Sequence, residues 1–138
     1  MTGADLRVAS TQDVHELCAR LLAFNRKASG FGFDEIPLQL ASHDAEGRLV
    51  AGLLGDICGG WLTIHVVWVD PDRRSHGLGS RLLLQAEQQA RTAGAHGVLL
   101  DTFDWQAEDF YLRRGYEVFG RLPDFPAGHE RIYLRKKL

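Results

Sequence analysis

Apolar residues in the first part of the chain repeat at helical spacing. Leu6–Ala9 predicts a short strand, after which Ser10 is a suitable N-cap for a helix over residues 11–24. The positions that carry the helical spacing are Val14, Leu17, Cys18, Leu21 and Leu22. Residues 25–37 contain two glycines and a proline, which break regular structure, so we expect a loop over a pocket there.

The next segments have extended patterns. Residues 38–43 predict a strand, and residues 49–57 and 61–69 predict two apolar strands that Gly59-Gly60 joins as a hairpin. Pro71 ends the second apolar strand, because proline has no N–H for a sheet ladder. These segments together predict antiparallel pairing.

Helical spacing returns from Leu78 onward and predicts a second long helix, with Gly94 at its C-terminal end. The rest of the chain predicts a strand over 98–103, a short helix over 107–113 and strands over 116–121 and 131–135. A strand–helix–strand unit within mostly antiparallel pairing predicts an α/β (α+β) fold. Its mixed central sheet would carry helices on both faces.

Composition narrows the class of protein. The 138 residues suit a single domain over 1–138, with ordinary fractions of apolar and charged residues. A net charge of −2 argues against a nucleic-acid binder, and no apolar run is long enough for a membrane span. The first residues lack the apolar core of a signal peptide, and Cys18 and Cys58 have no metal-ligand spacing. We therefore expect a cytoplasmic protein with reduced thiols and no metal.

Candidate chemistry concentrates in the segment Val66–Leu82. An apolar strand there runs through a turn with Arg73 and Arg74 into a helix, and Gly77 and Gly79 remove side chains at the helix start. The unpaired N–H groups of a first helical turn lie at the positive end of the helix dipole and suit phosphate oxygens. The turn lacks the P-loop pattern and the third glycine of GxGxxG. By itself it predicts some phosphate ligand, or else a glycine-containing turn with solvated arginines.

Two motifs resemble those of one known family. Arg74-Ser75-His76-Gly77-Leu78-Gly79 matches the R/Q-x-x-G-x-G/A signature of the GNAT superfamily of acetyl-CoA-dependent N-acetyltransferases. Residues 106–117 are similar to the family's A-x-x-F-Y-x-x-x-G-F/Y segment. The motifs stand at the expected separation, and the resemblance extends from about residue 49 to the carboxyl terminus. The chain is therefore identified as a small, single-domain, bacterial-type member.

The resemblance implies how acetyl-CoA is bound. Two parallel strands, here 61–69 and 98–103, are expected to splay and open a slot for the thioester. Backbone atoms of Val67, Trp68 and Val69 are expected to pair with the pantetheine arm like an added strand. The pyrophosphate is expected on the N–H groups of residues 74–80, supported by the Arg74 side chain and the Ser80 hydroxyl. The residues of this turn are Arg74, Ser75, His76, Gly77, Leu78, Gly79 and Ser80.

The resemblance also implies the reaction. A neutral amine attacks the thioester carbonyl, so an ammonium substrate must first lose a proton. A backbone N–H near Val69 is the expected donor to the carbonyl oxygen, where negative charge develops. Tyr111 is expected to act as the general acid that protonates the departing thiolate. The alternative interpretation of Tyr111 is an aromatic residue that packs a short helix onto the sheet.

The general base and the acceptor site are less defined. His65 is a candidate base, because an imidazole can accept a proton near neutral pH; the alternative is an ordinary sheet histidine. Asp101 and Asp104 lie near the end of a splayed strand and are candidates for a proton relay or for binding a cationic amine, or are simply solvated. We assign Asp101 with His65 to catalysis, and Asp104, Glu35 and Phe33 to the acceptor side.

Several further residues have a structural interpretation beside or in place of a functional one. Phe125 and Pro126 wall the acceptor site or a dimer contact, or they belong to an ordinary turn. Trp61, Phe103 and Trp105 are expected in the core or at the rim of the site.

The sequence therefore predicts an acetyl-CoA-dependent N-acetyltransferase that acts on a primary amine of a small cationic molecule. The alternatives are a non-catalytic module that binds acyl-CoA, a nucleotide-binding domain of another type, and an enzyme whose acceptor is a protein or peptide amine. Exposed terminal strands favour a homodimer.

Overall fold

The computed structural model describes residues 3–138. Its first helix begins with a capping box. Helix α1 (Thr11–Ser29) begins after Ser10, whose hydroxyl accepts from the Asp13 N–H, while the Asp13 carboxylate accepts from the Ser10 N–H. The helix ends at Gly30, which has the left-handed conformation (φ +70°) that suits glycine. Residues up to Asp34 form one unit of the chain, and Glu35–Leu138 form a second.

Two predictions for the first unit are wrong. Residues 25–29 are helical instead of part of a loop, because Gly30, and not the last apolar residue, sets the end of α1. Leu6–Ala9 is not a strand: no described residue pairs with it, and Leu6 and Val8 are fully or almost fully exposed. A strand requires a ladder partner, so a short apolar segment without one stays irregular.

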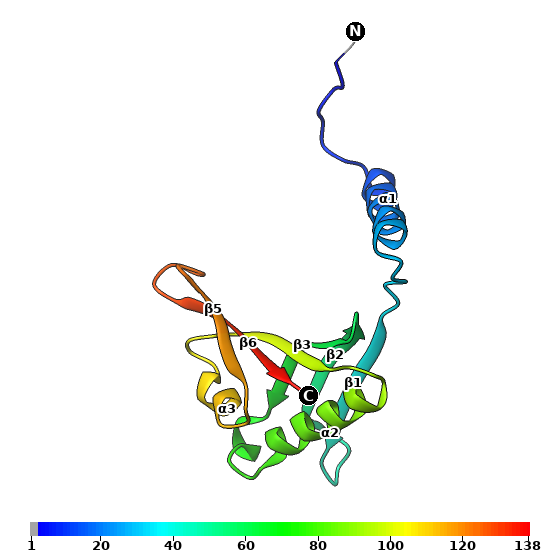
Figure 1. Ribbon diagram of the computed structural model, residues 1–138. Helices are drawn as coiled ribbons and strands as arrows, with labels where there is room; N and C mark the ends of the chain where they lie inside the picture. Colours follow the sequence, from blue (N-terminus) through cyan, green and yellow to red (C-terminus); the bar gives the residue numbers. More distant parts are fainter. Residues whose placement is uncertain (1–2) are drawn as a thin grey trace. The chain divides into compact units, whose positions relative to one another are not determined.

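The second unit is a six-stranded mixed sheet with two α-helices (Figure 1). Its strand order is β1-β2-β3-β4-β6-β5, and every pair is antiparallel except β3 with β4. The strands are β1 (Ile36–His43), β2 (Leu49–Cys58), β3 (Trp61–Val69), β4 (Gly97–Phe103), β5 (Glu117–Pro123) and β6 (Glu130–Lys137). The α-helices are α2 (Leu78–Thr92) and α3 (Glu108–Leu112). This confirms the predicted mixed, mostly antiparallel sheet with one parallel pair and helices, with element ends within a few residues of those expected. Helices on both faces stay a prediction.

One continuous apolar core joins α2 and α3 to the same face of the sheet. Alternate residues of β2, β3, β4 and β6 point into it, as the period of two in a strand requires. Leu53, Leu62, Val98, Ile132 and Leu134 are completely buried there. Each such side chain stabilises the fold by about 1.5–3 kcal/mol, so the core holds the sheet and both helices in fixed positions.

A buried polar cluster ties the end of α3 to α2 and β6. Glu87 on α2 is 1% exposed and accepts a hydrogen bond from the Tyr116 hydroxyl at 2.7 Å. Lys136 on β6 donates to both Glu87 oxygens, at 3.0 and 3.1 Å. Burial and the Glu87 carboxylate raise the pKa of Tyr116. The cluster therefore fixes the chain directly after α3, next to the candidate site.

Candidate active site

Strands β3 and β4 pair over only part of their length. Parallel pairing runs from Trp61 opposite Gly97 to Ile64 opposite Leu100 and then stops. Beyond this point β3 continues along β2, and β4 continues along β6. The two strands therefore part at the position where the sequence predicts a splayed pair, and each has one side without a strand partner.

A β-bulge lies where the strands part. Leu54 of β2 is opposite Val66, and Gly55 is opposite Ile64, so His65 has no counterpart on β2. An extra residue of this kind bends the strand that carries it. Gly55 allows the close approach, because a Cβ there would lie 2.6 Å from the Thr63 carbonyl oxygen. The bulge therefore turns the rest of β3 away from β4.

The turn after β3 leads into α2 without a side-chain cap. Gly77 is the N-cap residue, with a left-handed backbone (φ +81°), and no side chain accepts from the first N–H groups of α2. Gly79 allows Phe110 to approach closely, because a Cβ there would lie 3.3 Å from the Phe110 ring, which would have to shift slightly. The first helical turn thus offers unpaired backbone donors at the positive end of the helix dipole.

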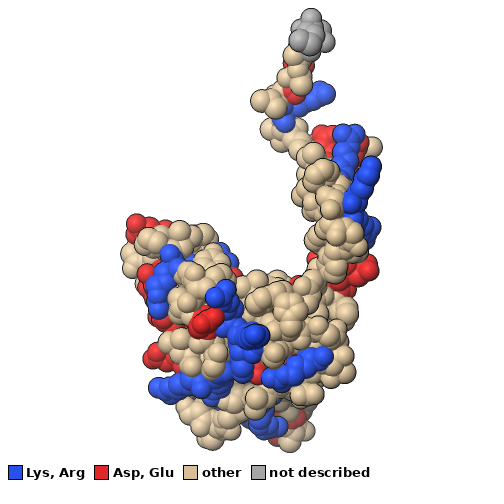
Figure 2. Space-filling model, in the orientation of Figure 1, with Lys and Arg blue, Asp and Glu red and all other residues tan. Residues whose placement is uncertain are grey.

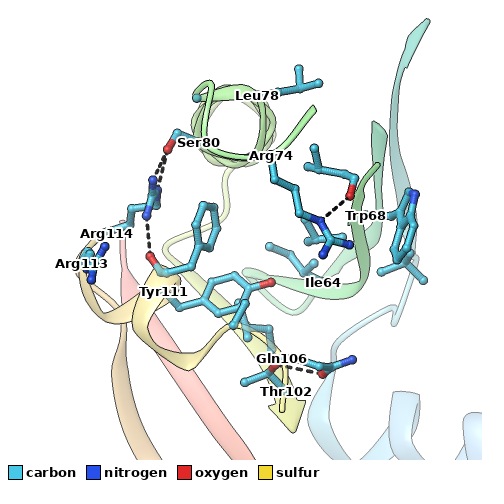
Figure 3. A pocket seen from close by; sticks show the side chains of 18 of the residues that line it. Ile64, Trp68, Arg74, Leu78, Ser80, Thr102, Gln106, Tyr111, Arg113 and Arg114 are labelled. Carbon is cyan, nitrogen blue, oxygen red and sulfur yellow. Dashed lines mark hydrogen bonds between the residues drawn. The ribbon is translucent and has the colours of Figure 1, made fainter. Parts of the chain in front are cut away.

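Two arginines are fixed beside this turn (Figure 3). The Arg74 Nε donates to the Val69 carbonyl oxygen at 2.8 Å, and its guanidinium lies 5.1 Å from the Trp68 ring centre. The Arg114 Nε donates to the Ser80 hydroxyl at 2.7 Å, and its guanidinium covers the Phe110 ring at 3.7 Å. The Ser80 hydroxyl, predicted to support a pyrophosphate, is therefore also the partner of Arg114, which the sequence analysis did not single out.

These features surround one cavity of about 940 Å³ between β3, the turn, α2, β4 and α3. The predicted site residues that line it are His65, Val67, Trp68, Val69, Arg74, Ser75, Gly77, Leu78, Gly79, Ser80, Asp101 and Tyr111. Four predicted residues are not among its lining: His76, Asp104, Glu35 and Phe33. Phe33 belongs to the first unit of the chain, where its ring lies edge-on to Phe31.

The charge of the cavity lining is strongly positive. Arg73, Arg74, Arg113 and Arg114 line it, and Asp101 is the only carboxylate among its described lining residues. Figure 2 likewise shows Lys and Arg side chains more numerous than acidic ones over the surface near α2 and α3. Positive potential in a concave site attracts anionic ligands, so the lining suits a phosphorylated molecule.

Tyr111 on α3 projects into the cavity (Figure 3). The residue is 7% exposed, and its ring packs edge-on against Phe110 and Tyr116. Burial raises the pKa of Tyr111 to about 12. The phenol is therefore protonated throughout the neutral range and is a hydrogen-bond donor inside the cavity.

His65 has a carboxylate partner that the sequence analysis missed. Its Nε2 lies 2.5 Å from Oδ2 of Asp56, on the neighbouring strand β2. His65 is among the residues that line the cavity, and the Asp56 carboxylate holds its ring through one nitrogen. The bulge at His65 breaks the register that strand alternation assumes, which is why the sequence did not reveal this pair.

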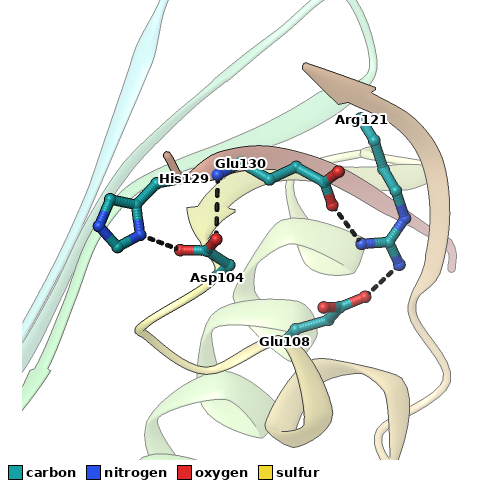
Figure 4. Close-up of polar contacts among 5 residues, drawn as sticks. All are labelled: Asp104, Glu108, Arg121, His129 and Glu130. Carbon is teal, nitrogen blue, oxygen red and sulfur yellow. Dashed lines mark hydrogen bonds and ion pairs between the residues drawn. The ribbon is translucent and has the colours of Figure 1, made fainter. Parts of the chain in front are cut away.

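The two predicted aspartates near the end of β4 are both paired. Asp101 accepts from the Arg131 Nε at 2.8 Å, and this carboxylate raises the pKa of Arg131. Asp104 accepts from the Glu130 N–H at 3.0 Å and lies 3.0 Å from the His129 Nδ1 (Figure 4). Asp101 therefore faces the cavity as a paired carboxylate, whereas Asp104 lies beyond the cavity lining.

Residues 3–138 contain no group of three or more His, Cys, Asp and Glu side chains placed to hold a metal ion. None of the described helices combines the length and apolar character needed to cross a membrane.

Comparison with known proteins identifies the family. The model of the acetyltransferase (GNAT) family matches residues 9–116. The chain is 42% identical over 93 residues to the blasticidin-S acetyltransferase of Streptomyces morookaense, which covers 67% of this chain and 68% of that protein. The protein belongs to the GNAT acetyltransferase family and is an acyltransferase.

Solved structures agree with this fold. The chain matches a 1.9 Å crystal structure of an acetyltransferase from Bacillus cereus with a TM-score of 0.92, at 27% identity and over 98% of each chain. A streptothricin acetyltransferase from Bacillus anthracis, solved in complex with acetyl coenzyme A, matches with a TM-score of 0.66 at 20% identity. That match covers 74% of this chain and 62% of the other, and at this identity it shows the fold alone.

Proposed function

We propose that this enzyme transfers the acetyl group of acetyl-CoA to a primary amine of a small cationic molecule by direct attack. The observation that carries the proposal is the position of the Tyr111 hydroxyl, in a cavity bounded by the free side of β3 and the uncapped start of α2. The relative at 42% identity is named for an antibiotic acceptor, which supports a small-molecule amine.

The parted strands support a role in cofactor binding. Because β4 no longer pairs with the end of β3, the backbone of Val67–Val69 has one side without a strand partner, where an extended pantetheine arm can pair. The Val69 carbonyl oxygen on this segment already accepts from the Arg74 side chain. The unpaired N–H groups of the turn from Arg74 to Ser80 suit the pyrophosphate. We assign Arg114 to the same function, because it is anchored on Ser80 at the cavity wall.

The reaction breaks the thioester C–S bond and forms an amide C–N bond. An ammonium acceptor loses one proton to become the attacking amine and a second as the C–N bond forms. We assign both to His65, oriented by Asp56, or to water beside Asp101; one proton in total is released to solvent and the other balances the thiol. A thiol has a pKa near ~8.5, below that of the buried Tyr111 phenol, so proton transfer from Tyr111 to a fully formed thiolate is uphill. We therefore assign the donation to the transition state: Tyr111 donates to the sulfur as the C–S bond breaks, and the phenol regains its proton from solvent as the thiol forms.

The acceptor side of the proposal includes Asp104, Glu35 and Phe33, together with Asp101. Glu35 lies at the start of the second unit, next to β1. A homodimer and a cytoplasmic location stay predictions.

The test is thiol release from acetyl-CoA with a panel of primary amines and peptides. Tyr111→Phe is expected to reduce kcat by about 10²-fold while calorimetry shows unchanged CoA binding. Tyr133→Phe is the matched control, because Tyr133 lies on β6 outside the cavity lining. CoA binding without acetyl transfer to any amine would instead identify a non-catalytic acyl-CoA-binding module, and equal kcat in both variants would remove Tyr111 from the mechanism.

A further inference from the structure

An aromatic platform lies at the rim of the cavity, where β4 ends. The Trp105 and Phe103 rings are stacked with centres 4.6 Å apart and planes 7° apart. Trp105 lines the cavity and is 55% exposed. Phe125 extends the stack, with its ring centre 6.0 Å from that of Phe103 and the two planes 27° apart. The Trp105 indole is thus supported by the Phe103 ring, and its exposed part is open to the cavity.

The platform is rigid. The Gln106 N–H donates to the Phe103 carbonyl oxygen at 2.9 Å and closes a turn around Trp105. The Gln106 side-chain oxygen accepts from the Phe103 N–H and from the Thr102 hydroxyl, at 2.9 and 3.0 Å. Because the turn is fixed from both sides, Trp105 is held in place before any ligand arrives, which reduces the entropy lost on binding.

The His129 imidazole, a hydrogen-bond acceptor, lies beside the platform. The His129 ring lies edge-on to Trp105, with ring centres 4.8 Å apart. Its Nδ1 lies 3.0 Å from the Asp104 carboxylate, which can only accept, so Nδ1 is the donor and, in the neutral ring, Nε2 is the acceptor. Figure 4 shows the Nε2 side of the ring pointing away from Asp104. The site therefore offers an acceptor for an N–H group next to a flat aromatic surface.

The surrounding charge is negative. Four carboxylates lie at this end of the sheet, those of Asp101, Asp104, Glu108 and Glu130, together with the guanidiniums of Arg121 and Arg131. Arg121 pairs with Glu108 and Glu130, and Arg131 pairs with Asp101 (Figure 4 shows the Arg121 pairs). Asp104 alone among the four carboxylates has no arginine partner in the described residues. A carboxylate that has no guanidinium partner, next to the rim residue Trp105, favours a positively charged ligand.

We propose that Trp105, His129 and Asp104 form a subsite that recognises a flat, positively charged group with N–H donors at its edge, such as a guanidinium, on the acceptor. The flat group stacks on the indole, its N–H donates to His129 Nε2, and its charge is balanced by Asp104. The inference rests on the proposed function, since it names the class of acceptor for the same enzyme.

The test compares two primary amines of equal charge, agmatine with a flat guanidinium and 1,5-diaminopentane with a tetrahedral ammonium. In the unchanged protein we expect the higher kcat/KM for agmatine. Trp105→Ala is expected to lower the ratio of kcat/KM for agmatine to kcat/KM for 1,5-diaminopentane about ten-fold. Trp105→Phe is expected to keep most of the preference for agmatine. His129→Phe keeps an aromatic contact but removes the acceptor, and is expected to lower the ratio about five-fold.

Phe119→Ala is the matched control, because Phe119 is a similarly exposed aromatic residue on β5 outside the cavity lining. An unchanged ratio in Trp105→Ala, with acetylation intact, overturns the subsite and leaves the proposed function standing. If neither amine is acetylated, calorimetric titration of agmatine in the presence of CoA decides the matter. Binding that Trp105→Ala weakens supports the subsite although the function fails, whereas equal or absent binding overturns the subsite.

Discussion

Removal of the Lys136 ammonium should destabilise the second unit of the chain more than any comparable change on the protein surface. Lys136 donates to both oxygens of Glu87, whose side chain is almost completely buried, and the Tyr116 hydroxyl supplies the third contact. In Lys136→Met the glutamate keeps a single donor and becomes a buried charge without a cation. Breaking a buried pair in this way costs about 3–5 kcal/mol. Because the Lys136 side chain is itself 21% exposed, we expect about 3 kcal/mol.

Urea unfolding followed by circular dichroism measures this loss. With a slope of about 2 kcal/mol per molar, the midpoint of Lys136→Met is expected to fall by about 1.5 M. Lys137→Met is the matched control, since Lys137 is the exposed neighbour on the same strand, and we expect a midpoint within about 0.3 M of the unchanged protein. Adding Glu87→Gln to Lys136→Met removes the uncompensated charge and should recover part of the loss.

Equal midpoints for Lys136→Met and Lys137→Met would refute the reasoning, because they would mean that the Glu87 charge is compensated without Lys136. A double variant less stable than Lys136→Met would refute the charge argument specifically. The cluster holds Tyr116 directly after α3, so we also expect kcat of Lys136→Met to fall at temperatures well below unfolding.

Three further predictions concern the site. Arg114→Ala removes the guanidinium from the Ser80 hydroxyl and should raise KM for acetyl-CoA about ten-fold with a smaller effect on kcat, as steady-state kinetics will show. His65→Gln should lower kcat by about 10²-fold at saturating substrates, and Asp56→Asn by less, in single-turnover measurements. The folded state raises the pKa of Tyr111 from 10 to about 12, so the stability that its protonated form contributes is intact below pH 10. That contribution, about 3 kcal/mol, should be lost between pH 10 and 12 in denaturant titrations.

Each of these has its own control. Arg91→Ala changes an arginine of α2 outside the cavity lining and should leave KM for acetyl-CoA unchanged; a matching increase there would make the Arg114 effect non-specific. Undiminished kcat in His65→Gln would transfer the base function to water or Asp101. Tyr111→Phe should lose less stability above pH 10 than the unchanged protein, and parallel losses would contradict the assignment.

The sequence predicts most elements of the second unit because their patterns are local. Periods of two and 3.6 define its strands and its long helix, and glycines mark its turns, as at Gly59-Gly60. Local patterns do not predict a structure that depends on contacts with residues elsewhere in the chain. Leu6–Ala9 has the residues of a strand but no ladder partner, and residues 25–29 are mostly polar yet continue a helix that Gly30 ends.

In the candidate site, too, local features could be predicted and long-range contacts could not. The turn from Arg74 to Ser80 could be predicted because its glycines and basic residues are consecutive. Arg114 could not, because its partner Ser80 lies 34 residues away and the contact depends on how α3 packs. The Asp56 partner of His65 depends on a bulge, and that of Asp104 and His129 on the meeting of β4 with β6.

The early end of the β3–β4 pairing leaves an edge strand in the interior of a sheet. Ordinary edges lie at the outside, where charges or bulges keep other chains from pairing with them. Here the end of β3 has no strand partner on the cavity side, and the Arg74 side chain covers only the Val69 carbonyl oxygen. An extended ligand that fills the gap completes the sheet, so its departure after each turnover recreates a template for strand addition. The vacant enzyme should therefore be the form most prone to self-association, and storage with coenzyme A should suppress it.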